Sequence, residues 1–235
     1  MCATRAMTSS RPEASALPIS SEPERESDYD RWVSIGAIHD IRSPLAIIKG
    51  YWELGILDPH HRDIISRNLE ELTQIVDVML ALHTVRAFDQ LDIGGLVREV
   101  CDDYLENARR QRVALRVAGD TFCANADGLS LRQCLRILLD NALEATPPGG
   151  TIEAILLREG DFGGIAVRDS GVGIPEELRG KLFEPGVTTK ANGHGVGLPI
   201  ARRILRQHQG DLRWEARHTG GSIFTMWLPL VTPES

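Results

Sequence analysis

Two stretches in the first third of the chain carry apolar residues at alternating steps of three and four, the spacing of a helix that buries one stripe in a bundle. The first stripe is Ile38, Ile41, Leu45, Ile48 and Trp52, and the second is Ile65, Leu69, Leu72, Val76 and Met79. The segment Leu57-Asp58-Pro59 breaks the pattern between them, which predicts an antiparallel helical hairpin. One hairpin has nothing long enough in its own chain to cover this wide apolar face. We therefore expect two copies to pair as a four-helix bundle, that is, a homodimer.

The sequence on either side of the hairpin divides into a tail and a mixed α/β region. Residues 1–28 are rich in Ser, Pro, Glu and Ala without periodicity, which predicts a disordered tail. After a hairpin over 29–88, residues 89–235 mix helix and strand patterns. We expect helices at 93–111, 129–145 and 201–207, and strands at 113–117, 151–157, 165–168, 212–216 and 223–228. Together these predict an α+β protein in which the hairpin precedes an α/β sandwich.

Composition and charge exclude several classes of protein. The 33 acidic residues outnumber the 26 basic ones, giving a net charge of -7, and no basic stripe is present, so we expect no nucleic-acid partner. No apolar run is long enough to cross a bilayer, and the N-terminus lacks the pattern of a secretory signal. The cysteines are scattered without zinc-site or disulfide spacing. These features predict a cytoplasmic protein with no membrane segment.

A histidine beside the first apolar stripe is a candidate nucleophile, in the motif His39-Asp40-Ile41-Arg42-Ser43-Pro44. A neutral imidazole can attack phosphorus if its second nitrogen is held by an acceptor, and Asp40 is positioned to do this. Ser43 lies one helical turn beyond His39 on the same exposed face, where it can orient a water. Pro44 removes a helix hydrogen bond beside the histidine. The alternative is a surface histidine on a bundle helix.

Two glycine-rich stretches predict a phosphate-bearing ligand. Asp169-Ser170-Gly171-Val172-Gly173-Ile174 directly follows an expected strand, and residues 193–198 lead into an expected helix. Glycines let the backbone approach a ligand closely, and amides at a helix start attract phosphate oxygens. Asp169 can accept a hydrogen bond from an exocyclic amine. Neither stretch has the spacing of a P-loop or lies in a Rossmann unit.

With these motifs in place, the chain resembles the sensor histidine kinases of two-component systems over about residues 30–229. The order and spacing of the motifs carry the resemblance. Residues 39–44 resemble the family's H-box, 138–142 the N-box, 169–173 the G1 box, 182–185 the F-box, and 193–198 the G2 box.

The resemblance implies an ATP-binding sandwich of the gyrase, Hsp90 and histidine kinase type, with ATP and Mg²⁺ as cofactors. Asn141 would ligate Mg²⁺ and Asp169 would hold the adenine amine. Further pocket residues would be Gly171, Gly173, Gly193, Gly195, Gly197 and Leu198. A lid would run from about Glu184 to Gly197 and contain Thr188, Thr189 and Lys190, for which a solvated loop is an equal alternative.

The resemblance also implies a reaction and its partners. His39 would be phosphorylated from ATP and would pass the phosphoryl group to an aspartate on the receiver domain of a response regulator. Because no recognisable sensor domain precedes Asp30, we expect a separate sensor protein. Ser43 would help to dephosphorylate the partner.

The sequence departs from the family pattern at Ser43, Ile137, Glu144 and Val196. Ile137 and Glu144 leave open a nucleotide-binding regulatory phosphatase or scaffold with weak autokinase activity. A non-kinase ATPase of the same fold is a further alternative. The His39 motif argues against this ATPase, as does the lack of a Glu at position 137 that could activate water.

Overall fold

The computed structural model describes residues 44–54, 88–188 and 195–231, together with several positions between 61 and 72. Residues 44–53 form a helix, as the first apolar stripe predicts. Leu45, Trp52 and Leu69 are 52%, 75% and 50% exposed in the single chain. Most of the expected hairpin, its dimer contact and the tail over 1–28 lie outside the described residues. In the described part of the chain, no helix is both long and apolar enough to cross a membrane.

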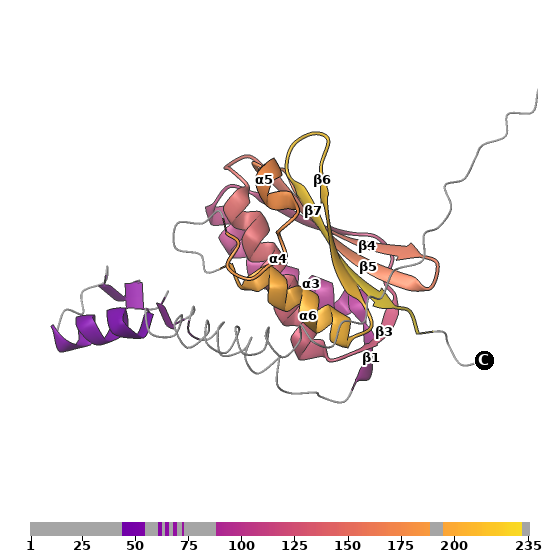
Figure 1. Ribbon diagram of the computed structural model, residues 1–235, viewed down its shortest axis with the longest axis horizontal. Coiled ribbons are helices and arrows are strands. Elements are labelled where there is room, and N and C mark those ends of the chain that lie inside the picture. The colour runs from indigo at the N-terminus through magenta and orange to yellow at the C-terminus, as the bar shows by residue number, and fades with distance from the viewer. Residues whose placement is uncertain are drawn as a thin grey trace, which may run out of the picture.

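The α/β domain contains two sheets and four helices in the described region (Figure 1). In chain order its elements are β1 (Asp89–Asp92), α3 (Ile93–Arg110), β2 (Ala114–Ala118), β3 (Cys123–Ala126), α4 (Gly128–Ala145), β4 (Thr151–Glu159), β5 (Phe162–Asp169), α5 (Glu176–Arg179), α6 (Gly197–Gln207), β6 (Asp211–Ala216) and β7 (Ser222–Pro229).

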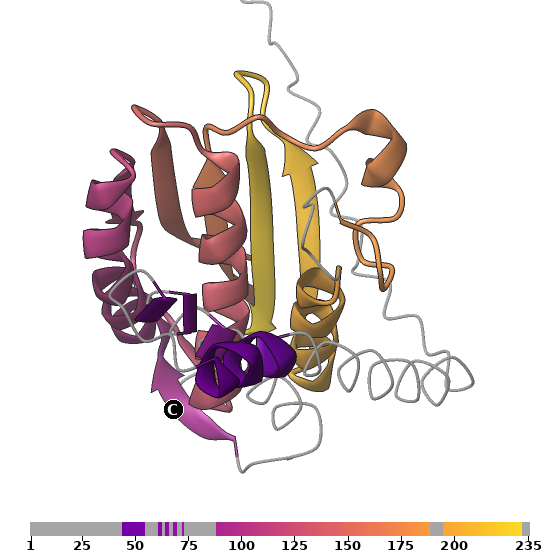
Figure 2. The ribbon, with the colours of Figure 1, turned by 90° about the vertical axis from the view of Figure 1, so that its left-hand side faces the viewer.

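The larger sheet is mixed and has the strand order β2-β4-β5-β7-β6. Strand β2 pairs with β4 in parallel, whereas the other neighbouring pairs are antiparallel. Helices α3, α4 and α6 cover one face of this sheet, as Figure 2 shows from the helical side. The sequence prediction of a sandwich with helices on a mixed sheet is therefore confirmed.

The two long helices α3 and α4 begin in the same way, because each directly follows a short strand and an aspartate cap. The side chain of Asp92 accepts a hydrogen bond from the amide of Gly94, and that of Asp127 accepts one from the amide of Leu129. Such caps satisfy amides that have no partner within the helix. Strands β1 and β3 pair with each other, so the starts of both helices are tied together at one end of the domain.

The core lies between the helical layer and the larger sheet. Apolar side chains of α4 and α6 meet those of the central strands, and each fully buried Leu or Ile contributes about 1.5–3 kcal/mol of transfer free energy. The largest side chains that are fully buried include Leu131, Leu135, Leu138, Leu139, Ile152, Ile165, Ile200, Ile204, Leu205 and Leu212.

Three elements were not expected from the sequence: β1, β3 and the four-residue helix α5. In addition, α6 begins at Gly197 rather than at Ala201. Pro199 lies in the first turn of α6, where its missing amide costs no hydrogen bond.

Candidate nucleotide-binding site

Asp169 is the last residue of β5, and its carboxylate is held by the backbone of two loops. The amide of Gly171 donates to Oδ1 at 2.8 Å, and the amide of Ser222 donates to Oδ2 at 3.2 Å. The residue is 4% exposed. Each carboxylate oxygen can accept more than one hydrogen bond, so Asp169 retains capacity for an external donor such as an adenine amine.

The electrostatics of Asp169 reflect this burial. Loss of solvent raises the pKa of its carboxyl group, while the amides of Gly171 and Ser222 and the charge of Arg217 oppose the rise. Arg217 also donates from Nη1 to the Asp169 carbonyl at 3.1 Å. The carboxylate is therefore fixed in place before any ligand arrives.

The loop after β5 is pressed against the C-terminal end of α4. The amide of Val172 donates to the carbonyl of Ala145 at 3.2 Å. A Cβ on Gly171 would lie 2.4 Å from the same carbonyl oxygen, so no larger residue fits there without a backbone shift. This contact brings the Asp169 loop beside the last turns of α4, the helix that carries Asn141.

Asn141 is half-buried in α4, one turn beyond Ile137. Ile137 is also half-buried, and its Cγ2 would lie 3.2 Å from a Cβ placed on Gly197, the first residue of α6. The Asn141-bearing helix thus packs against the start of the helix that follows the second glycine motif. Ile137 also packs against the core.

The two ends of the expected lid meet where the amide of Gly186 donates to the carbonyl of Gly195 at 3.1 Å. Gly195 has a φ of +65°, a left-handed conformation that favours glycine. Thr188 is described, but Thr189, Lys190 and Gly193 lie outside the described residues. Gly197 and Leu198 open α6, whose first turn has no side-chain cap among the described residues. Its amides are therefore suited to phosphate oxygens.

Asn141 can supply one oxygen ligand to a Mg²⁺ ion. No group of three or more His, Cys, Asp or Glu side chains in the described part of the chain could hold a metal ion. Mg²⁺ commonly uses one or two protein oxygens together with substrate phosphates and water. A single amide oxygen from Asn141 is consistent with an ion that arrives with the nucleotide.

The sequence does not predict the contacts between the site and residues that lie far from it along the chain. The Tyr104 hydroxyl of α3 donates to Oδ1 of Asp140 at 2.8 Å, next to Asn141. Burial, and then the charge of Asp140, raise the pKa of Tyr104. Arg217 and the Ser222 amide approach Asp169 from beyond β6 and from the start of β7. These partners are 36 to 53 positions apart, so no local pattern marks them.

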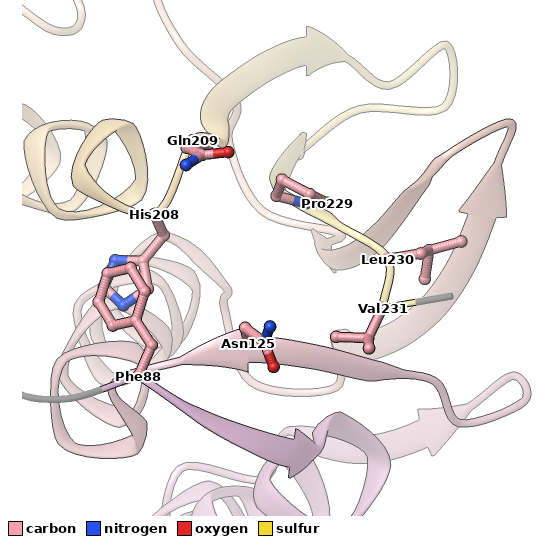
Figure 3. A pocket seen from close by; sticks show the side chains of 7 residues that line it. All are labelled: Phe88, Asn125, His208, Gln209, Pro229, Leu230 and Val231. Atoms are coloured by element: carbon pink, nitrogen blue, oxygen red, sulfur yellow. The ribbon is translucent and has the colours of Figure 1, made fainter. Parts of the chain in front are cut away.

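A separate pocket lies at the other end of α6, near His208, the residue that directly follows this helix (Figure 3). It measures about 400 Å³ and is lined by Phe88, Asn125, His208, Gln209, Pro229, Leu230 and Val231. Because α6 has 11 residues, this pocket is about 16 Å along the helix from Gly197. The pocket is thus distinct from the glycine-lined site.

His208 anchors the entry of the chain into the α/β domain. Its ring stacks on Phe88 with centroids 4.5 Å apart. Nε2 accepts from the Asp127 amide at 3.0 Å, so Nδ1 carries the proton and donates to the Ile204 carbonyl at 2.7 Å. Burial lowers the pKa of His208. The neutral imidazole therefore joins the cap of α4 to the end of α6.

Comparison with known proteins agrees with this arrangement. Residues 126–232 match the profile of the histidine kinase-, DNA gyrase B- and HSP90-like ATPases. Sporulation kinase A of Bacillus subtilis (strain 168) is 30% identical over 210 residues, covering 84% of this chain and 34% of that protein. Sensor histidine kinase ZraS of Escherichia coli (strain K12) is 31% identical over 209 residues, covering 84% and 45%. The chain thus spans about a third to a half of the length of these two relatives.

Solved structures show the same relationship. The catalytic domain of histidine kinase ThkA in a nucleotide-free form has a TM-score of 0.58 and 32% identity, covering 62% of this chain and 97% of that one. Histidine kinase ThkA in complex with the response regulator protein TrrA has a TM-score of 0.67 and 30% identity, covering 88% and 64%. The fold is therefore the ATP-binding sandwich shared by gyrase-type and Hsp90-type ATPases and histidine kinases. The chain itself belongs to the histidine kinase family.

Proposed function

We propose that this protein phosphorylates its own His39 from ATP and transfers the phosphoryl group to an aspartate on the receiver domain of a response regulator. The observation that supports this most strongly is the meeting of the Asp169 carboxylate, the Gly171 loop and the start of α6 beside the Asn141-bearing helix. The same chain carries the His39 motif.

The chemistry assigns separate roles to the two parts of the chain. Asp169 holds the adenine amine, and the amides that open α6 receive phosphate oxygens. Lys190 in the lid meets a phosphate. A Mg²⁺ ion at Asn141 would neutralise charge on the phosphates. A neutral nitrogen of His39 attacks the γ-phosphorus in line with the departing β–γ bridging oxygen, ADP leaves, and the second imidazole nitrogen gives its proton to Asp40.

The same proposal includes the partners. Two copies pair through the hairpin in the cytoplasm, a separate sensor protein supplies the signal, and Ser43 orients a water that dephosphorylates the partner. The complex of ThkA with TrrA supports a receiver domain as the acceptor, since that kinase is 30% identical to this chain.

The experiment is incubation of the purified chain with Mg²⁺ and ATP labelled in the γ-phosphate. We expect label that is lost in acid and retained in alkali, as for a phosphoramidate. His39→Gln removes it, whereas His83→Gln, a second histidine of the expected hairpin, retains it. Equal labelling of wild type and His39→Gln contradicts the assignment.

A regulatory phosphatase with weak autokinase activity is the second candidate. The packing of Ile137 against the start of α6 favours it, because an apolar side chain stands where the family commonly has a polar one. Under this alternative, label incorporation is slow, yet decay of a phosphorylated receiver domain is fast and is slowed by Ser43→Ala. Comparison of the two rates decides between the candidates.

A further inference from the structure

Two arginine side chains attach the segment between the Asp169 loop and the lid to the rest of the domain. On α5, Arg179 donates from Nε to the Ile174 carbonyl at 3.1 Å, and its guanidinium carbon lies 5.6 Å from the centre of the Trp214 ring. On α6, the guanidinium carbon of Arg202 lies 4.6 Å from the centre of the Phe183 ring. Both separations are within the range at which a cation is attracted to an aromatic face.

Arg202 is itself held in one orientation by Asp211 at the start of β6. Its Nε donates to Oδ1 at 2.8 Å and its Nη2 donates to Oδ2 at 3.2 Å, which is a two-pronged pair. Their side chains are 30% and 29% exposed. Burial works to raise the pKa of Asp211, but the hydrogen bonds and charge of Arg202 hold it below its usual value. The pair is therefore charged at neutral pH, and its fork fixes the plane of the guanidinium.

Phe183 lies directly before the base of the lid. The amide of Glu184 donates to the Lys181 carbonyl at 2.9 Å, and the Glu184 carbonyl accepts from the Val187 amide at 3.4 Å. One residue before Val187, the Gly186 amide donates to the Gly195 carbonyl at 3.1 Å. These hydrogen bonds connect the residue that follows Phe183 to the first residues of the lid.

We propose that Arg202, oriented by Asp211, is a positioning residue that clamps Phe183 and so fixes the base of the nucleotide lid. This inference rests on the proposed function, because it assumes that the nucleotide binds under this lid. Without the clamp, the lid base occupies more conformations in the free protein. Only a fraction of molecules is then ready to bind, and the apparent affinity falls by that fraction.

The test compares Arg202→Met with Arg206→Met in the full chain. Arg206 makes a good control because it approaches the same Asp211 carboxylate at 3.6 Å from one turn further along α6, and its side chain is more exposed, at 54%. We expect Arg202→Met to weaken binding of ADP and of Mg²⁺ with ATP by about tenfold, equivalent to about 1.4 kcal/mol. Hydrogen exchange at the Gly186 amide becomes faster by a similar factor. We expect Arg206→Met to change neither nucleotide affinity nor the exchange rate of the Gly186 amide by more than about twofold. This is well below the tenfold change that corresponds to about 1.4 kcal/mol.

A charge swap separates positioning from simple stabilisation. Arg202→Asp combined with Asp211→Arg allows an ion pair to form again but removes the guanidinium from its place on α6 over Phe183. We expect the swap to recover melting temperature and not nucleotide affinity. Recovery of both overturns the inference, as does an Arg202→Met variant that binds nucleotide like wild type.

Two further arms keep the result decisive. If Arg202→Met does not fold, Arg202→Lys replaces it in the test, because lysine retains the charge but lacks the planar fork. We expect Arg202→Lys to weaken nucleotide binding as well, but by a smaller factor. If the wild-type chain fails to bind nucleotide, the proposed function is wrong. The exchange rate of the Gly186 amide in Arg202→Met and Arg206→Met then still reports whether Arg202 holds the lid base.

Discussion

Replacing Asp169 by Asn tests the nucleotide site most directly, because the two side chains have nearly the same shape. In the native protein both carboxylate oxygens accept, from the amides of Gly171 and Ser222 at 2.8 and 3.2 Å. The amide group of Asn has only one acceptor oxygen. In either orientation its NH₂ therefore faces one of these backbone donors, and one hydrogen bond is lost.

The size of the effect follows from this geometry. A hydrogen bond to a charged acceptor is worth about 1.5–3 kcal/mol. In the complex, the adenine amine loses its charged acceptor and meets either the NH₂ group or the neutral oxygen of the introduced Asn side chain, so we expect affinity for ADP to fall by about 10- to 150-fold. Folding stability changes less, because a neutral Asn side chain does not carry the cost of burying a charge, which is the cost that raises the pKa of Asp169. We expect the melting temperature to stay within about 4 °C of wild type.

Titration calorimetry with ADP in the absence of Mg²⁺ measures the affinity without a contribution from Asn141. Asp161→Asn is the matched control, since it removes the same charge at an exposed position in the turn between β4 and β5. An Asp169→Asn variant that binds ADP as tightly as Asp161→Asn would falsify the assignment of Asp169 as the adenine acceptor.

Three further perturbations test the helix beside the site and the two ends of the domain core. Ile137→Asn is expected to lower stability by about 1 kcal/mol through lost packing and to raise the labelling rate by up to about tenfold; a less stable and no faster variant refutes a functional role for this position. Tyr104→Phe removes the hydrogen bond to Asp140 and should cost about 1–2 kcal/mol in urea unfolding, whereas an unchanged midpoint means that the bond does not stabilise the helix pair. Burial lowers the pKa of His208, so the neutral form of this side chain stabilises the folded state fully above the unfolded-state pKa of about 6.5. As the pH falls from there toward the lower folded-state pKa, the free energy of unfolding decreases by at most about 1.4 kcal/mol per pH unit. Urea unfolding between pH 8 and pH 5 measures this loss, and an equally steep loss in His208→Gln assigns it to other groups.

The sequence predicts the long elements well because their patterns are strong and local. The helix around Leu135 and Leu139 and the strand pair turning at Gly160 both follow from periodicity and turn residues. The sequence pattern does not predict strands β1 and β3, because each has only four residues and few strand-forming side chains. Their sequences are Asp-Gln-Leu-Asp and Cys-Ala-Asn-Ala. Each is stabilised by the other, more than 30 positions away, and only the fold brings them together.

The candidate site divides in the same way. Asp169 and its glycines stand in one short motif, so their proximity is evident from the sequence. The amide of Ser222 and the side chain of Arg217 contact Asp169 from about 50 positions away in the sequence. Ser222 contributes only its backbone amide, which any residue type except proline would provide. The sequence places the start of α6 four residues too late, because glycine, as at Gly197, is more often found just past the end of a helix than in its first turn, although Pro199 is compatible with a helix start.

Both the first and the last described segments of the α/β domain form backbone hydrogen bonds with strand β3. Asp89 to Asp92 pair with it as β1, and further along the chain the Val231 amide donates to the Cys123 carbonyl at 3.1 Å. Entry and exit therefore lie side by side, around the pocket of Figure 3. Domains with adjacent ends tolerate circular permutation and insertion into other proteins. Residues 89–231 could thus be closed by a short linker and reopened at the exposed Gly160 turn, or grafted into a surface loop of a fluorescent protein as a nucleotide reporter.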